Sequence, residues 1–343
     1  MLRAEWIPYR LRFTFTAVTS RETMQAKDTY IIKVWDVENP ECVGIGECNL
    51  FRGLSADDTP VYESQIDQMC RSGLEEIPQC SSLLFGAETA LADLRGGGQR
   101  LLWPSAWTRG EEGIRINGLV WMGSKQLMLS RIKEKVAAGF RCIKLKIGGI
   151  NIEEEIELIE ALRSHFPVSE LEIRLDANGS LSPENALRIL ELLSQYGIHS
   201  IEQPIHAGQW REMEKLCSET PIPIALDEEL IGMRSDAEKQ EMLDAIKPQY
   251  IILKPALCGG FGHADAWIAE AEKRGIGWWA TSALESDIGL NAIAQWVALK
   301  NPEMPQGLGT GQLYSNNFPS PLNLRGERLW HDPSSIWALF NII

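Results

Sequence analysis

From about residue 114 onward, short apolar runs alternate with amphipathic segments, and this alternation limits the fold more than any other feature of the sequence. The runs have the length and composition of buried strands, and they cover residues 114–121, 142–147, 171–175, 200–202, 222–226, 250–254, 277–280 and 306–308. The segments between them begin and end as helices do: Ser182 and Pro183 open one, and Gly197 closes it. Alternating strands and helices form parallel sheets with right-handed crossovers.

Eight such units within about 195 residues predict an α/β fold of the (β/α)8, or TIM-type, barrel class. The alternative is an open doubly wound sheet. Many such sheets carry a glycine-rich dinucleotide or phosphate loop after a strand, and no such loop follows any of the eight runs. We therefore expect a closed barrel over residues 114–311.

The first hundred residues have a different pattern. Residues 6–16 and 29–36 alternate apolar and polar side chains, as half-buried antiparallel strands do, and residues 61–78 and 83–95 look helical. Three consecutive glycines at 96–98 are the best candidate for a boundary. We expect an α+β unit over residues 1–100, with the irregular tail, residues 312–343, packing back on it.

Charge and cysteine content narrow the class of protein. Acidic residues outnumber basic ones by 47 to 33, and this excess disfavours nucleic acids and anionic membranes as partners. No run reaches 18 uncharged apolar residues, so we expect no transmembrane helix, and the first residues do not resemble a signal peptide. The seven cysteines are odd in number and form no C-x-x-C pair, as expected of reduced thiols in a cytoplasmic protein.

Charged side chains lie where the predicted strands end. In a barrel of this kind the catalytic groups stand at the carboxyl ends of the strands. Successive strands end with Lys146, Asp176, Glu202, Asp227 and Lys254, in steps of 30, 26, 25 and 27 residues. Each step is one β/α unit, so these groups should face one another around one mouth.

Three carboxylates on three consecutive strands would repel one another, and a hard divalent cation removes that repulsion. Mg²⁺ prefers oxygen ligands and keeps positions free for substrate or water. Zinc is disfavoured, because no histidine or cysteine joins the set. The pattern predicts a site for Mg²⁺ formed by Asp176, Glu202 and Asp227. Mn²⁺ shares these preferences, and the sequence does not distinguish the two ions.

Lysines flank this predicted metal site on two sides. Lys144 and Lys146 are two residues apart on one strand and therefore point to the same face. Crowding of two cations beside a metal should lower the pKa of one of them, which then acts as a base. Lys254 faces the metal from across the barrel. This arrangement suits removal of a proton alpha to a carboxylate, with the metal holding the enediolate. Taken alone, each of these residues could have a structural role instead of a catalytic one. Lys144, for example, could be the partner in a buried ion pair.

At these residues the sequence resembles the enolase superfamily, in its muconate-lactonizing subgroup. The resemblance covers nearly the whole chain and implies an α+β capping domain closed over a modified barrel. It also implies that Asp176, Glu202 and Asp227 are metal ligands and that Lys146 and Lys254 are the acid/base pair. The subgroup includes cycloisomerases, epimerases, racemases and dehydratases, so the motifs do not by themselves select a reaction.

Narrower segments resemble the o-succinylbenzoate synthases: residues 252–255, 282–289 and 307–311. That resemblance implies dehydration of 2-succinyl-6-hydroxy-2,4-cyclohexadiene-1-carboxylate, a step of menaquinone synthesis. Lys146 would take the alpha proton and return it to the departing hydroxyl, while Lys254 would stabilise the enediolate. Dipeptide epimerases usually carry an Asp-x-Asp after the eighth strand, and residues 307–311 (GLGTG) contain no acid.

Several further residues are candidates for contact with the substrate, a small-molecule carboxylate. Thr281, Ser282 and Gly307 are placed to meet its succinyl carboxylate, and Lys144 and Asn178 to support the reacting groups. By analogy, loops 19–27 and 49–55 of the cap should also reach the substrate, with Arg52 as a carboxylate partner. An N-acylamino acid racemase and a dipeptide epimerase remain alternatives, as does a binding barrel that has lost catalysis. The sequence does not indicate an oligomeric state.

Overall fold

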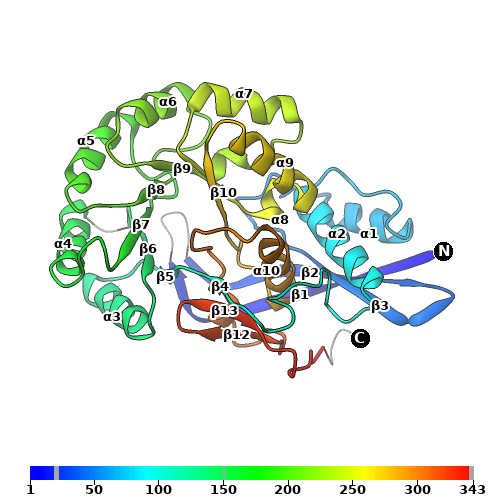
Figure 1. Ribbon diagram of the computed structural model, residues 1–343. Coiled ribbons are helices and arrows are strands. Elements are labelled where there is room, and N and C mark those ends of the chain that lie inside the picture. Colours follow the sequence, from blue (N-terminus) through cyan, green and yellow to red (C-terminus); the bar gives the residue numbers. More distant parts are fainter. Residues whose placement is uncertain (19–22, 150, 340–343) are drawn as a thin grey trace.

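The computed structural model describes residues 1–18, 23–149 and 151–339, and the described strands form three sheets (Figure 1). The strands are β1 Leu2–Val18, β2 Thr23–Asp36, β3 Asn39–Cys48, β4 Ile114–Arg115, β5 Gly118–Val120, β6 Cys142–Lys146, β7 Glu172–Asp176, β8 Ser200–Glu202, β9 Ile224–Leu226, β10 Tyr250–Leu253, β11 Gly277–Ala280, β12 Leu322–Arg325 and β13 Arg328–His331. The helices are α1 Tyr62–Arg71, α2 Ser81–Arg95, α3 Lys125–Ala137, α4 Ile152–Arg163, α5 Pro183–Ser194, α6 Trp210–Glu219, α7 Asp236–Ile246, α8 Pro255–Cys258, α9 Gly260–Glu272 and α10 Asp287–Lys300.

The predicted barrel is present. Strands β5 to β11 pair in chain order and are all parallel, and helices α3 to α7 lie outside them in Figure 1. The predicted eighth strand is reduced to two bridged residues: Gln306 pairs with Ile116 and Gly307 pairs with Thr281. These bridges join the first and last strands, so the sheet is closed as expected of a barrel and not open as in a doubly wound fold.

Large side chains fill the barrel below the carboxyl ends of its strands. Arg174 precedes Asp176 by two residues on β7, so both point inward. The guanidinium of Arg174 stacks 4.3 Å from the ring centroid of Trp279 and donates to the carbonyl of Pro305 at 2.9 Å. Both side chains are buried. The barrel is therefore filled at this level, below the ends of its strands.

The N-terminal unit is an antiparallel sheet, β1-β2-β3, with helix α2 packed on it. Strand β3 was not predicted, because its Gly44 and Gly46 weaken the strand pattern. The glycines permit close packing: a Cβ on Gly46 would lie 2.0 Å from the carbonyl oxygen of Gly86 in α2. Strand β2 begins at Thr23, so residues 23–27 are strand where a loop was expected. Residues 19–22 lie outside those described.

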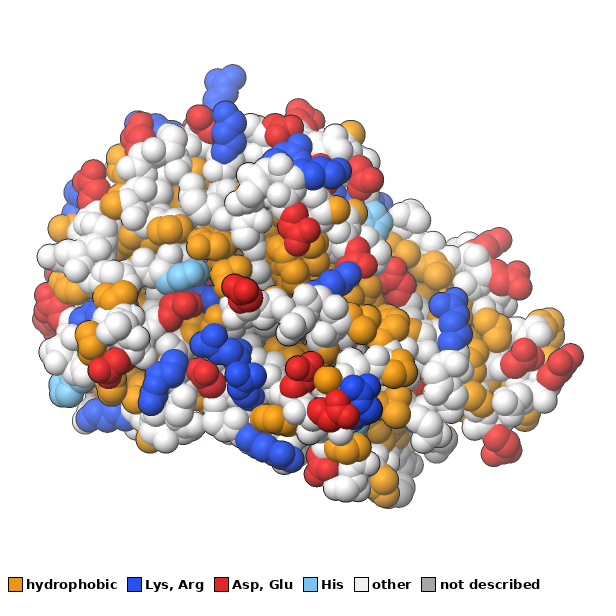
Figure 2. Space-filling view, viewed as in Figure 1, with side chains coloured by type: hydrophobic (Ala, Val, Ile, Leu, Met, Phe, Trp, Pro, Cys, Tyr) orange, Lys and Arg blue, Asp and Glu red, His pale blue; other side chains and the backbone are white. Residues whose placement is uncertain are grey.

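The C-terminal tail contacts both parts of the molecule. Tyr9 donates its hydroxyl to the carbonyl of Asn316 at 2.7 Å, and the side chain of Asn316 accepts from the backbone of Arg12. The hairpin β12–β13 pairs instead with β4, at the start of the barrel. In Figure 2 acidic and basic side chains are interspersed over the face shown. No helix of the described residues is long and apolar enough to cross a membrane.

Asp287 links the tail to the first turn of α10. Its carboxylate accepts hydrogen bonds from Asn317, at 2.8 Å, and from the hydroxyl of Ser320. Burial raises the pKa of Asp287 to about 7, although these two hydrogen bonds act in the opposite direction. The contact between tail and barrel therefore includes a carboxyl group that titrates near neutral pH.

The pKa of Asp287 is higher in the folded protein than the value of about 3.9 expected when the chain is unfolded. The unfolded chain therefore loses this proton first, and the folded state loses stability as the pH rises from about 4 through about 7. Asp287→Asn removes this titrating group. Between about pH 5 and about pH 8, we therefore expect the free energy of unfolding of the variant to fall by on the order of 2 kcal/mol less than that of the wild type. Urea unfolding of both proteins measures it, and equal pH slopes would contradict the assignment.

Candidate active site

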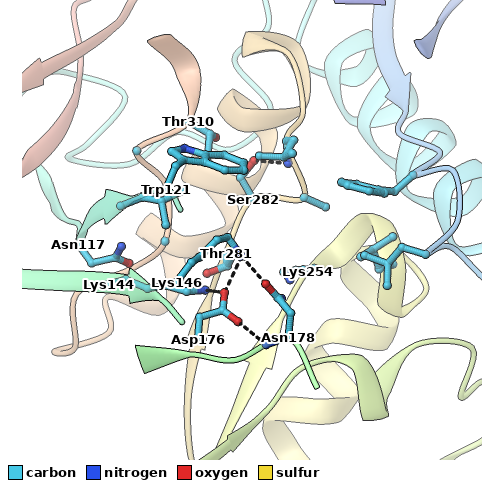
Figure 3. A pocket seen from close by; sticks show the side chains of 18 of the residues that line it. Asn117, Trp121, Lys144, Lys146, Asp176, Asn178, Lys254, Thr281, Ser282 and Thr310 are labelled. Carbon is cyan, nitrogen blue, oxygen red and sulfur yellow. Dashed lines mark hydrogen bonds and ion pairs between the residues drawn. The ribbon is translucent and has the colours of Figure 1, made fainter. Parts of the chain in front are cut away.

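The structure brings the predicted charged residues together at the upper mouth of the barrel. Lys146 pairs with Asp176 across β6 and β7, and Asp176 pairs with Glu202 across β7 and β8. Asp227 directly follows β9, and Lys254 directly follows β10. Strands β6 and β10 lie four positions apart in the sheet, so Lys146 and Lys254 reach the mouth from opposite sides of the barrel, and Figure 3 shows both among the residues around the cavity. All three carboxylate side chains are at most 2% exposed, so water does little to screen their charges.

Each carboxylate has a lysine partner. The ammonium of Lys144 contacts Asp176 at 2.9 Å and also bonds Glu202. Lys146 donates to Asp176 at 2.9 Å and to the side-chain oxygen of Asn178 at 2.7 Å. Lys254 bonds Asp227 and lies 3.9 Å from Glu202. The predicted supporting residues Lys144 and Asn178 therefore both contact the charged cluster.

The carboxylates have the larger effect on the pKa of Lys144. Burial lowers that pKa, but Asp176 and Glu202 outweigh burial and raise it above its ordinary value. The lowered pKa expected from the crowding of two lysines does not hold for Lys144, because the carboxylates lie closer than the sequence spacing revealed. Glu202 shows the opposite balance: burial and the charge of Asp176 raise its pKa to about 7. Lys144 therefore stays protonated in this arrangement.

The three carboxylates offer a hard cation the oxygen ligands that it prefers. One oxygen, Oε1 of Glu202, is buried and accepts no hydrogen bond. Among the described residues no group of three or more His, Cys, Asp or Glu side chains is arranged to hold a metal ion as it stands, since Lys144 and Lys254 lie between the carboxylates. The donor set suits Mg²⁺ chemically, and its binding would require these two lysines to release their partners.

A cavity of about 760 Å³, including its opening, lies above this cluster, and Figure 3 shows the side chains around it. The cap contributes an apolar wall formed by Met24, Phe51 and Leu54. Arg52 does not line the cavity: its guanidinium donates to Asp58 at 2.6 Å and to the hydroxyl of Tyr30 at 3.1 Å. Loop 49–55 reaches the cavity through Phe51 and Leu54, whereas Arg52 points away from it.

Part of the cavity lining is polar and uncharged. It includes Thr281, Ser282 and Gly307, together with Asn117 and Thr310. The hydroxyls of Thr281 and Thr310 and the side-chain oxygen of Asn117 are buried without a hydrogen-bond partner. Buried polar atoms of this kind are usually satisfied, so this part of the lining is suited to a polar ligand group.

Sequence reasoning missed Asn117, Thr310 and Trp121. Trp121 follows β5, and its ring centroid lies 5.9 Å from the ammonium nitrogen of Lys146. The signal for Trp121 was available, since it is the last residue of a predicted strand, and groups at that position face the site. Asn117 also had a signal, since it lies four residues before Trp121 in the same predicted strand and therefore on the same face. Thr310 lies in an irregular segment, where no periodicity indicates the direction of a side chain.

The fold and the site define an enzyme built on a capped (β/α) barrel, with charged groups at the carboxyl ends of its strands. A family model described as "Enolase C-terminal domain-like" matches residues 127–329, and the chain belongs to this family. An o-succinylbenzoate synthase of Desulfotalea psychrophila is 44% identical over 93% of this chain and 96% of that protein. An L-Ala-D/L-amino acid epimerase of a Maribacter species is 26% identical over 84% of each.

Solved structures show the same fold. The crystal structure of MenC from Desulfotalea psychrophila has a TM-score of 0.86 and 41% identity, covering 96% of this chain and 99% of that one. Muconate lactonizing enzyme from Pseudomonas fluorescens, complexed with muconolactone, has a TM-score of 0.82 at 21% identity, covering 98% of this chain and 96% of that one. A dipeptide epimerase from Enterococcus faecalis, complexed with Mg and a dipeptide, has a TM-score of 0.83 at 19% identity, covering 97% of each chain.

Replacing Lys144 by methionine would leave Asp176 and Glu202 buried without their shared cation. We expect Lys144→Met to lower the free energy of unfolding by on the order of 3 kcal/mol in the presence of chelator. Lys33→Met is the control, because its partner Glu5 is 52% exposed and the pair should contribute less than about 1 kcal/mol. Urea denaturation measures both, and similar losses in the two variants would be inconsistent with a compensating role for Lys144.

Proposed function

We propose that this protein is an o-succinylbenzoate synthase, a carbon–oxygen lyase of menaquinone biosynthesis. Its substrate would be 2-succinyl-6-hydroxy-2,4-cyclohexadiene-1-carboxylate, which loses water to give o-succinylbenzoate. The observation that carries the proposal is the 44% identity to an o-succinylbenzoate synthase over nearly the whole length of both chains. A match of this extent covers the cap as well as the barrel, and both contribute walls of the cavity.

The lining of the cavity supports a substrate with two carboxylates. In the described part of the chain, three lysines and one carboxylate, that of Asp176, line the cavity. The uncharged part of the lining offers hydroxyl and amide groups from Thr281, Thr310 and Asn117. A substrate ammonium against these groups would lack a carboxylate partner, and burial of an unpaired charge is costly. We propose that these groups, with Ser282 and the backbone of Gly307, receive the succinyl carboxylate.

We assign Asp176, Glu202 and Asp227 as the residues that would hold a divalent cation, Mg²⁺ or Mn²⁺. The buried Glu202 oxygen that accepts no hydrogen bond supports this assignment. When bound, the cation would supply positive charge beside the substrate carboxylate and make the neighbouring carbon-bound proton more acidic. The three carboxylates would then exchange their ammonium partners for the cation.

Lys146 is the residue that we assign as the base. Asn178 orients its amine, and the ring of Trp121 limits access of water on one side. Lys146 takes the proton from the alpha carbon. The carbon–oxygen bond then breaks, and Lys146 returns the same proton to the departing hydroxyl, which leaves as water. One base on one face implies syn elimination.

Lys254 faces the substrate from the opposite side of the barrel and stays protonated. Burial lowers its pKa, but Asp227 and Glu202 have the larger effect and raise it. An ammonium at this position stabilises negative charge on the substrate as the proton leaves. We also propose a cytoplasmic location, which the seven free cysteines support.

Turnover of the cyclohexadiene carboxylate tests the function directly. With Mg²⁺ we expect rapid loss of the substrate's ultraviolet absorbance, and chelator should abolish it. Lys146→Ala should lower kcat by about 10²- to 10⁴-fold, because it removes the base. Arg52→Ala is the control and should keep wild-type activity, since Arg52 lies outside the cavity lining. Retention of most activity by Lys146→Ala would refute the one-base mechanism.

Racemization or epimerization is the second candidate, and one observation favours it. Lys146 and Lys254 line the same cavity from opposite sides of the barrel, as a two-base enzyme requires. N-acylamino acids and dipeptides incubated with the protein in D₂O distinguish the two reactions. A dehydratase of restricted specificity leaves these compounds unlabelled, whereas a racemase or epimerase introduces deuterium at the alpha carbon of both stereoisomers.

A further inference from the structure

A buried polar cluster joins the cap to the barrel behind the cavity wall. Its members are Lys27 on β2, Asn49 after β3 and Glu285 in the loop between β11 and α10. Lys27 is 7% exposed, and Asn49 and Glu285 are fully buried. None of the three lines the cavity, although Lys27 and Asn49 belong to the two cap loops that were expected to reach the substrate.

Asn49 is the centre of this cluster. Its side-chain oxygen accepts a hydrogen bond from the ammonium of Lys27. Its amide nitrogen donates to the carbonyl of Ala283 at 3.0 Å and to the carboxylate of Glu285 at 2.8 Å. Only an amide of this length can accept from an ammonium and donate to two oxygens at once, since a carboxylate lacks the donor and a hydrocarbon lacks both.

The cluster holds two walls of the cavity at once. On the barrel side, Glu285 accepts from the hydroxyl of Ser282, and Asn49 fixes the backbone of Ala283. On the cap side, Lys27 lies 5.9 Å from the ring centroid of Phe51. Phe51, Ser282 and Ala283 all line the cavity. The distance between cap wall and barrel wall therefore depends on contacts made outside the cavity.

The buried charges in and beside this cluster must compensate one another. A second buried carboxylate, Glu47, bonds the hydroxyl of Ser286 at 2.6 Å and that of Thr29 at 2.9 Å. Burial lowers the pKa of Lys27, while the charges of Glu47 and Glu285 act in the opposite direction and favour its ammonium form. A buried charge must be compensated, so loss of Lys27 would leave two carboxylates at this interface without that compensation.

We infer that Lys27, Asn49 and Glu285 are positioning residues that hold Phe51 against the segment Ser282–Leu284 and so set the fit of the substrate's remote carboxylate arm. The inference deepens the proposed function and rests on it for the identity of the substrate. The reacting groups at Lys146 and Asp176 are not part of this cluster. Changes in it should therefore affect substrate binding more than the chemical step.

Steady-state kinetics of Asn49→Leu and Lys27→Met test the inference. We expect KM to rise about 10-fold or more while kcat stays within about threefold of wild type, the pattern of lost binding that is equal in ground and transition states. Asp93→Asn is the matched control: Asp93 is a buried cap carboxylate that accepts hydrogen bonds from the backbones of Ile45 and Arg100. It should lower the melting temperature without raising KM.

A charge-compensated pair separates positioning from general destabilisation. Lys27→Met/Glu285→Gln removes one charge of each sign, and we expect its KM to lie between that of Lys27→Met and that of the wild type. If Asn49→Leu does not give folded protein, this double variant carries the test. The inference is overturned if KM follows melting temperature across all variants, the Asp93→Asn control included, or if kcat falls as much as KM rises.

Failure of the proposed function is distinguishable from failure of this inference. If wild-type protein does not dehydrate the cyclohexadiene carboxylate, the proposed function is wrong. The same variants are then compared on the N-acylamino acid or dipeptide that the wild type does process. An unchanged KM in Asn49→Leu, on whichever substrate the wild type turns over, rejects the positioning role.

Discussion

Three buried ammonium groups and three buried carboxylates compensate one another at the mouth of the barrel. The order and register of the strands bring these opposite charges together. At this depth an uncompensated charge would cost several kcal/mol. The parallel register places Lys146 beside Asp176 and Asp176 beside Glu202, so the backbone itself brings opposite charges together. Under the proposed function, the same groups would exchange partners when a cation and an anionic substrate enter, so a stable resting arrangement would be compatible with a reactive one.

The rest of the molecule supports this mouth from below and from above. Below it, Arg174 and Trp279 fill the barrel, so the charged groups stand on a packed floor. Above it, the cap contributes the apolar wall that includes Phe51. The floor comes from residues of the barrel strands themselves, whereas the upper wall comes from the cap, which precedes the barrel strands in the chain. The upper wall therefore needs its own attachment to the barrel, and buried polar contacts provide it.

The features that could be predicted from sequence are those that repeat with a regular period. Strand and helix alternation identified the barrel, and the spacing of Asp176, Glu202 and Asp227 placed them on adjacent strands. Features that depend on one local turn were not predictable: nothing in the sequence indicates that Phe51 points inward and Arg52 outward. The strand containing Gly44 and Gly46 was also missed, because its glycines are selected by the approach of α2 and not by strand propensity.

The contact between Asn49 and Glu285 spans 236 residues of chain. At a synthesis rate of roughly 5 to 20 residues per second, Asn49 leaves the ribosome roughly 10 to 50 seconds before its partner. During that interval the cap sheet can form, but its buried lysine and carboxylates have no barrel loop to meet. The final docking of the cap must therefore follow synthesis of the last barrel strands. The cap is therefore synthesised before the barrel but reaches its final packing after it.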